Sequence, residues 1–136
     1  MKPEKHEKFI ISQKAILIRD NKVLILKSAE HVNIWDLPGG RIDENERAKE
    51  AFSREIEEET GIKKFENRGV VDYGIFISKF GRKAMVIVNL IENNKDEIVL
   101  SHEHAEIKWI REEEVEDYQF FFQELNEIIK MGFYLN

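Results

Sequence analysis

An acidic run inside a segment otherwise typical of a helix constrains this chain most. Glu55, Glu57, Glu58 and Glu59 fall within five residues, shortly after the pair Gly39-Gly40. Carboxylates at this spacing repel one another along an isolated helix. A requirement other than helix stability must therefore account for them, and a hard divalent cation bound through oxygen ligands is the obvious candidate.

Helical geometry separates these acids into two groups. On a helix, Glu58 and Glu59 fall about 60° to one side and about 40° to the other side of Glu55, so the three share one arc and can close on a common ion. Glu57 points to the opposite side of the helix, toward solvent. Earlier residues on the shared arc are Ala48, Ala51 and Phe52. The stripe begins apolar and ends acidic, which predicts a helix that enters as a core element and ends as the wall of a site.

The residues that flank the acidic run fit a helix preceded by a ligand-binding turn. We expect the helix at about Glu46 to Thr60, with Asn45 as its N-cap and Gly61 as a left-handed C-cap. The segment 35–40 supplies a backbone that Pro38 stiffens and two glycines then free. Glycine before a helix also lets backbone carbonyls and amides approach a ligand closely.

The segment 40–62 resembles the Nudix hydrolase signature. That signature reads Gly, five residues, Glu, seven residues, Arg-Glu, an aliphatic residue, any residue, Glu-Glu, any residue, Gly and an aliphatic residue. This sequence matches it without a departure at Gly40, Glu46, Arg54, Glu55, Ile56, Glu58, Glu59, Gly61 and Ile62. So long a match is far more specific than a short glycine motif. Segments 35–40 and 106–110 also look like Nudix segments.

The resemblance implies a Nudix-type α/β/α sandwich with a mixed sheet between helices, and hydrolysis of a diphosphate linkage in a nucleoside diphosphate derivative. The expected cofactor is Mg²⁺, for which Mn²⁺ can substitute, because the ligands offered are oxygens and the chain has no cysteine. Glu55, Glu58, Glu59 and the Gly40 carbonyl are the expected metal ligands. In the family, Arg54 orients the glutamates through ion pairs, and Glu46 is its expected partner.

The general base is left open between Glu55 and a loop glutamate. In Nudix proteins the loop before the later Trp-bearing strand often delivers one more glutamate, and Glu103 is our choice, with Glu106 in reserve because it would lie exposed at a strand start. His102 and His104 flank Glu103, but their spacing matches no common zinc motif, so zinc is not expected.

Three further residues are candidates for contact with substrate. His31 lies in the loop before Trp35, where contact with substrate and simple solvation are equally consistent with its position. Trp35 and Trp109 are expected to be packing residues rather than residues that stack on a base.

Composition limits the remaining classes. With 136 residues, 42% of them hydrophobic and 35% charged, the chain is expected to form a single Nudix domain over residues 1–136. The net charge of −6 argues against broad nucleic-acid binding, and no apolar run is long enough for a membrane span. The absence of cysteine suits a cytoplasmic protein. The expected partner is a nucleotide, with no membrane partner; a homodimer is left open.

The remaining pattern is α/β. Strands are expected at 12–19 and 22–27, joined by the turn Asp20-Asn21, and their continuous apolar runs predict a sheet covered on both faces. Further strands are expected at 69–77, 83–91 and 106–110, with a turn at 80–82. From Val115 onward the pattern turns helical. Core spacing there is shown by Phe121, Leu125, Ile128 and Ile129.

Substrate identity is the least constrained property. Features that resemble the ADP-ribose, dinucleoside polyphosphate, NADH and coenzyme A subfamilies are not apparent; the only prolines, for example, are Pro3 and Pro38. A house-cleaning activity on nucleoside triphosphates is therefore favoured, with nucleotide sugars, ADP-ribose and dinucleoside polyphosphates as alternatives. A non-catalytic nucleotide sensor is the alternative of another class, and intact Glu58 and Glu59 argue against it. The isoprenoid-diphosphate isomerase branch requires a cysteine that this chain lacks.

Overall fold

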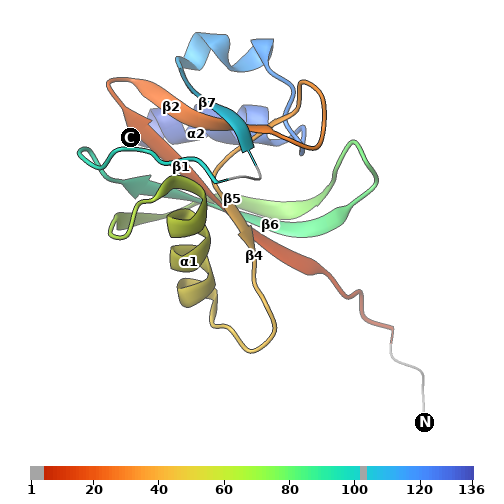
Figure 1. Ribbon diagram of the computed structural model, residues 1–136. Helices are drawn as coiled ribbons and strands as arrows, with labels where there is room; N and C mark the ends of the chain where they lie inside the picture. Colours follow the sequence, from red (N-terminus) through yellow and green to blue (C-terminus); the bar gives the residue numbers. More distant parts are fainter. Residues whose placement is uncertain (1–4, 102–103) are drawn as a thin grey trace.

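Continuous apolar runs on the first two strands place them at the centre of the molecule. The computed structural model describes residues 5–101 and 104–136. Its elements are β1 (Ile10–Arg19), β2 (Lys22–Ser28), β3 (Trp35–Asp36), β4 (Gly39–Arg41), α1 (Ala48–Thr60), β5 (Glu66–Ile77), β6 (Lys83–Glu92), β7 (His104–Ile110), the 3₁₀ helix η1 (Glu112–Asp117) and α2 (Leu125–Leu135) (Figure 1).

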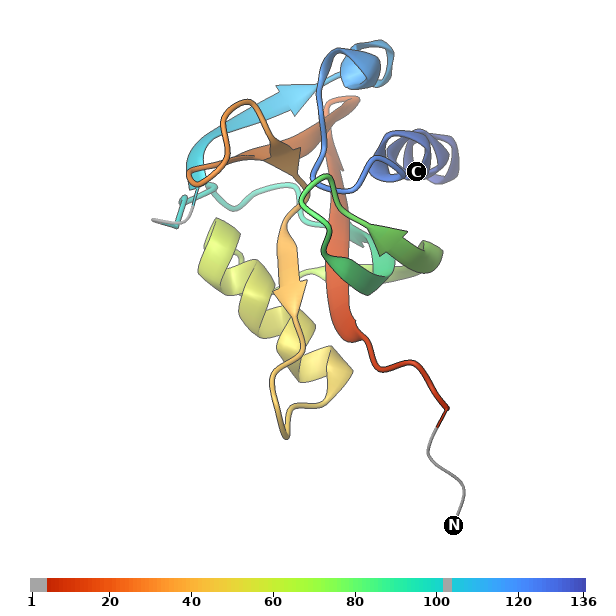
Figure 2. The ribbon, with the colours of Figure 1, turned by 90° about the vertical axis from the view of Figure 1, so that its right-hand side faces the viewer.

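The two faces of this central layer bury different residues. Ala15, Leu17, Leu24 and Leu26 pack with residues of α1 such as Phe52 and Ile56. The alternating positions of the same strands pack in a second cluster with residues of α2, and these positions are Ile16, Ile18, Val23 and Ile25. Figure 2 shows α1 and α2 on opposite sides of the strands. The predicted α/β architecture, with a mixed sheet covered on both faces, is confirmed.

Strand β1 joins the two halves of the sheet. The strand order is β3-β2-β1-β6-β5, with β4 paired to β1 and β7 paired to β2. Residues 10–17 of β1 run parallel to β6, whereas Ile18 and Arg19 pair with β2 in the antiparallel hairpin. Residues 12–14 also pair with Gly39–Arg41 of β4. The short strand β4 is thereby fixed against the most buried strand of the molecule.

Helix α1 begins at Ala48, two residues later than predicted, and the prediction of Asn45 as its N-cap is wrong. Arg47 is the N-cap, and Asn45 adopts a left-handed conformation with φ 68°. The cause lies in the preceding turn, where the Glu46 carboxylate accepts a hydrogen bond from the Asp43 N–H at 2.9 Å. The C-cap prediction is confirmed: Gly61 has φ 78° and its N–H donates to the Glu57 carbonyl.

The segment after η1 also differs from the expected continuous helix. It stays non-helical as far as Glu124, and Trp35 exchanges backbone hydrogen bonds with it: the Trp35 N–H donates to the Gln119 carbonyl and the Phe121 N–H donates to the Trp35 carbonyl, each at 2.9 Å. Phe120 and Phe122 are buried from this non-helical segment, and α2 begins only at Leu125. Aromatic spacing alone therefore does not distinguish this segment from a helix.

Among residues 5–101 and 104–136, no helix combines the length and the apolar character that crossing a membrane requires.

The β1–β2 turn offers a direct test of this backbone. Asp20 and Asn21 have φ 49° and 64°, the left-handed pair that a tight hairpin requires. We expect Asn21→Ala to lower the free energy of unfolding by about 1 kcal/mol, because alanine tolerates this conformation less well than asparagine. Asn21→Gly is the control and should retain the wild-type value in urea denaturation. Equal destabilisation by both variants would contradict the assigned turn.

Candidate active site

The acidic end of α1 lies directly on the backbone of β4. A Cβ atom added to Gly40 would lie 2.3 Å from the Glu55 carboxylate, and one added to Gly39 would lie 1.9 Å from the Gln13 carbonyl oxygen of β1. Both glycines are therefore required for close approach, Gly40 to the helix and Gly39 to the neighbouring strand. The contact places the backbone of Gly40 against the side chain of Glu55.

Glu59 is the most deeply buried of these acids. Its carboxylate accepts a hydrogen bond from the Gly39 N–H at 2.7 Å, and its other oxygen lies 3.7 Å from Nε2 of His104. Burial raises the pKa of Glu59 to about 8, against the opposing effects of Lys14 and the Gly39 N–H. The surrounding protein thus supplies too little positive charge to favour the ionised form.

Arg54 holds the other acids together. Its guanidinium donates to both oxygens of Glu46, at 2.7 and 2.8 Å, in a bidentate contact. Its Nη1 lies 3.0 Å from Glu55 and 3.2 Å from Glu58. The contact between Arg54 and Glu46 that the sequence predicted is present. The same guanidinium therefore sets the positions of two glutamates that lie one turn apart on α1.

The four acids of the run differ in exposure. The Glu55 side chain is 18% exposed and the Glu58 side chain 56% exposed. Glu57 is exposed on the opposite side, as expected, and Glu59 is buried. Within the part of the chain that the structure describes, no three acidic or histidine side chains already form a closed metal site. Glu58 instead turns toward Arg54.

The donor set nevertheless fits a hard divalent cation. Burial also raises the pKa of the half-buried Glu55, but Arg54 offsets part of that effect, so the buried Glu59 has the larger deficit of positive charge. An oxygen-binding cation would supply that charge, and carboxylate and carbonyl oxygens are the ligands that Mg²⁺ and Mn²⁺ prefer. Glu55, Glu59 and the backbone of Gly40 offer such oxygens on adjoining elements.

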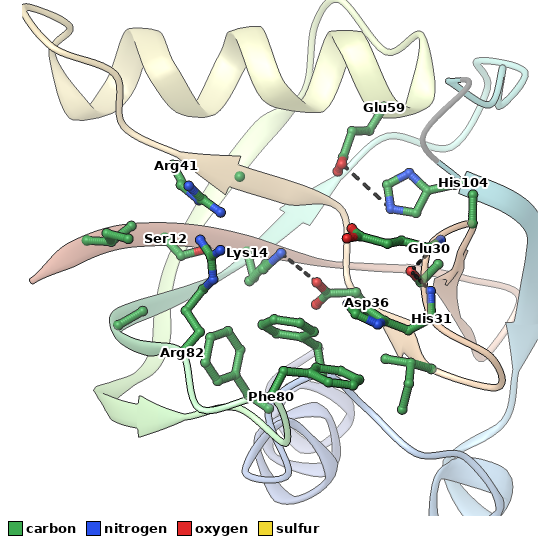
Figure 3. A pocket seen from close by; sticks show the side chains of 18 of the residues that line it. Ser12, Lys14, Glu30, His31, Asp36, Arg41, Glu59, Phe80, Arg82 and His104 are labelled. Carbon is green, nitrogen blue, oxygen red and sulfur yellow. Dashed lines mark hydrogen bonds and ion pairs between the residues drawn. The ribbon is translucent and has the colours of Figure 1, made fainter.

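A cavity of about 1100 Å³, here called the first cavity, opens beside these acids. Gly40 and Glu59 line this cavity, and Figure 3 shows Glu59 on the side opposite Phe80. Lys14 lies on its floor and forms an ion pair with Asp36 at 2.8 Å. Burial lowers the pKa of Lys14, but Asp36, Glu59 and Glu55 outweigh that effect and raise it above its usual value, so Lys14 is a fixed cation. Arg41 and Arg82 extend into the same space from β4 and from the β5–β6 turn.

Aromatic rings form the opposite wall of the first cavity. His31 stacks on Phe80, with ring centroids 3.8 Å apart and planes inclined by 14°. Phe121 lies next to both rings. These side chains come from the β2–β3 loop, the β5–β6 turn and the segment before α2, so three distant parts of the sequence build one wall. The first cavity thus has acidic, basic and aromatic parts.

The sequence reasoning missed Lys14, Asp36, Phe80, Arg82 and Phe121 as residues of this cavity. Lys14 carried a signal, because it is a charged residue directly before the continuous apolar run Ala15 to Ile18 of a strand expected to be covered on both faces. The sequence predicts Phe80 and Arg82 only as residues of a turn. It does not indicate which side chains of that turn point into a cavity. For His31 the sequence left two possibilities open, contact with substrate or simple solvation. The structure places this residue in the wall of the first cavity.

The remaining predicted residues divide into three groups. Glu103 and His102 lie outside the described residues. Glu106, the reserve choice, forms an ion pair with Lys27 at 3.3 Å and does not line the first cavity. The two tryptophans are packing residues, as expected: Trp35 is buried against Tyr118, and Trp109 packs against the α1 side of the core.

The two glycines of β4 predict separable defects. Gly40→Ala should lower kcat by on the order of 10²-fold with little loss of stability, because the flexible end of Glu55 can move aside but then leaves its position. Gly39→Ala should lower the free energy of unfolding by more than about 2 kcal/mol, because its Cβ would meet backbone atoms at φ 141°. Thermal unfolding and steady-state kinetics measure the two effects. Equal effects of both variants on stability would contradict this placement.

The Glu46–Arg54 pair predicts a pH-dependent contribution to stability. Hydrogen bonding to Arg54 lowers the pKa of Glu46 from 4.5 to about 2. The pair therefore stabilises the folded state above pH 4.5, and this contribution is lost as pH falls from 4.5 through about 2. The difference in unfolding free energy between wild type and Glu46→Gln should shrink over that range. Glu44→Gln in the same turn is the control, and a difference for Glu46→Gln that stays constant down to pH 2 would count against the pair.

Comparisons with known proteins identify the family of this chain. The family model described as NUDIX domain matches residues 10–130. The chain is 31% identical over 119 residues to an RNA pyrophosphohydrolase of Pelagibacter ubique, covering 75% of each protein. It is 30% identical over 110 residues to an 8-oxo-dGTP diphosphatase of Buchnera aphidicola, covering 77% of this chain and 79% of that protein. A crystal structure of a MutT protein from Methanosarcina mazei superposes with a TM-score of 0.76 at 25% identity, covering 95% of this chain and 96% of that one. The chain belongs to the NUDIX domain family of hydrolases.

Proposed function

We propose that this protein hydrolyses a diphosphate linkage of a nucleoside triphosphate, using a divalent cation held by the acidic end of α1. The observation that carries the proposal is the first cavity, which has carboxylates and the Gly40 backbone on one side, cations on its floor and stacked aromatic rings on the other side. A nucleotide has a matching sequence of parts, with a planar base at one end and phosphates at the other. Relatives named as an 8-oxo-dGTP diphosphatase and an RNA pyrophosphohydrolase support the reaction class.

Each part of the cavity has a role in this proposal. The base stacks against the Phe80 and His31 wall, since aromatic faces accept any base by stacking. Arg41, Arg82 and Lys14 face the phosphates, where positive charge offsets the negative charge of the substrate. Arg54 does not contact the reacting atoms. It positions Glu55 and Glu58 through its hydrogen bonds.

Glu55, Glu58, Glu59 and the Gly40 carbonyl would hold the cation. When bound, Mg²⁺ neutralises negative charge that develops on the phosphate oxygens in the transition state. Glu55 is one candidate to accept the proton of the attacking water, and Glu103, which precedes β7 in the sequence and lies outside the described residues, is the second. The two candidates are distinguished by comparing Glu55→Gln with Glu103→Gln, because the base variant should lower kcat more than it raises KM.

A substrate panel tests the proposal directly. The protein is incubated with Mg²⁺ and canonical or oxidised nucleoside triphosphates, a nucleotide sugar, ADP-ribose, a dinucleoside tetraphosphate and a 5′-triphosphorylated RNA. The products are separated by ion-exchange chromatography, and phosphate release is measured with and without added pyrophosphatase. Turnover of a nucleoside triphosphate that yields pyrophosphate supports the proposal. If the protein prefers the 5′-triphosphorylated RNA, the proposed substrate class changes from nucleoside triphosphates to RNA, the substrate in the name of the Pelagibacter relative. Absence of any turnover would favour a non-catalytic nucleotide sensor.

The acidic helix provides a matched set of variants. Glu58→Gln and Glu59→Gln should each lower kcat by roughly 10²–10³-fold at saturating Mg²⁺, because each removes one anionic ligand from the place where transition-state charge builds. Glu57→Gln removes the same charge from the exposed side of the same helix and should keep wild-type kcat. Circular dichroism checks that all three variants are folded. Wild-type kcat in Glu59→Gln would falsify the ligand assignment.

A further inference from the structure

A second cavity of about 830 Å³ lies on the other face of the sheet, between α1 and strands β1, β5 and β6. Side chains alternate along a strand, and β1 shows this clearly. Ser12 and Lys14 line the first cavity, and Gln13 between them lines the second. The two cavities therefore lie back to back across β1, and the second cavity is separate from the space assigned to the substrate.

The floor of the second cavity carries two buried amide side chains. Gln13 is 7% exposed and Asn89 is 6% exposed. The register pairs Ala15 with Asn89, so Gln13 and Asn89 lie on the same face of neighbouring strands. The Gln13 Oε1 atom is fully buried and has no hydrogen-bond partner in the described structure. A buried acceptor left unpaired is costly, so this oxygen requires a donor that the described residues do not provide.

The rim of the second cavity is cationic. Lys49, Lys63 and Lys64 line it, and none of them forms an ion pair with a carboxylate among residues 5–101 and 104–136. These three exposed lysines make the opening locally positive in a chain of net charge −6. Phe52 and Phe65 provide an apolar wall, with their rings packed edge to face at 5.5 Å. The cavity thus combines an acceptor at depth, an aromatic wall and cations at its mouth.

We propose that the second cavity is a binding site for a nucleoside monophosphate or a ligand of the same chemistry, which carries an N–H donor on a planar ring and a phosphate. The ring would enter beside Phe65, and rotation of the Gln13 side chain amide would turn its unpaired oxygen toward the cavity to accept a hydrogen bond from the ring N–H. The phosphate would remain at the mouth, where the lysines provide charge-assisted hydrogen bonds. Neither a simple anion nor an uncharged nucleoside satisfies both ends of the cavity. This site is independent of the substrate assignment for the first cavity.

Nuclear magnetic resonance of the ¹⁵N-labelled full chain tests the proposal without turnover. AMP is titrated in the absence of divalent cations, with inorganic phosphate and adenosine titrated separately. We expect saturable shifts of the Gln13 and Asn89 side-chain amides and of the backbone amides of residues 63–65. Shifts at His31 and at residues 80–82 would report the first cavity instead. AMP should bind more tightly than either fragment.

Two variants and a control decide the outcome. Lys63→Ala combined with Lys64→Ala should weaken AMP binding, read at the Asn89 amide, by at least about tenfold. Gln13→Leu should weaken it as well while the protein remains folded, because this variant removes the unpaired oxygen. Lys95→Ala removes an exposed charge that does not line the second cavity and should leave binding unchanged. Shifts confined to the first cavity, affinity for phosphate equal to that for AMP, or unchanged binding in the double lysine variant would each overturn the proposal.

Discussion

The close packing of α1 on the two glycines of β4 is the contact on which the rest of the site depends. Glu59 accepts a hydrogen bond from the Gly39 N–H, and Glu55 occupies the space that a side chain at position 40 would fill. Strand β4 is itself held by β1, the most central strand of the sheet. The acids are therefore positioned by the core of the molecule rather than by a flexible loop, which is the arrangement that a precise site requires.

Charge is distributed unevenly around this contact. Arg54 neutralises the outer acids, where Glu46 holds it in a bidentate contact and Glu55 and Glu58 share its Nη1 atom. For the inner acid, Glu59, Lys14 is the one permanent cation nearby among the residues that the structure describes, and Lys14 is already paired with Asp36. The inner part of the site is consequently short of positive charge, whereas the outer part is not. We propose that a bound cation makes up this difference.

Much of the fold followed from local sequence signals, because those signals have local physical causes. The apolar runs of β1 and β2 predicted a doubly covered sheet, and the conformational freedom of Gly61 marked the end of α1 correctly. The Asn45 cap failed because Glu46 closes a turn with Asp43 before the helix begins. The aromatic wall could not be predicted, since Phe80 and Phe121 meet only through the tertiary arrangement of distant segments. The fold and the acidic helix were thus predictable from the sequence, and the aromatic wall of the first cavity was not.

Paramagnetic broadening by Mn²⁺ tests the central claim most directly. Substoichiometric Mn²⁺ is added to the ¹⁵N-labelled protein, and loss of amide signal is measured along the chain. A cation held between β4 and the acidic end of α1 should broaden residues 39–41 and 55–59 first, and Glu59→Gln should reduce this effect while Glu57→Gln preserves it. Broadening centred on another acidic surface, such as residues 112–117, with residues 39–41 unaffected, would contradict a cation site at this contact.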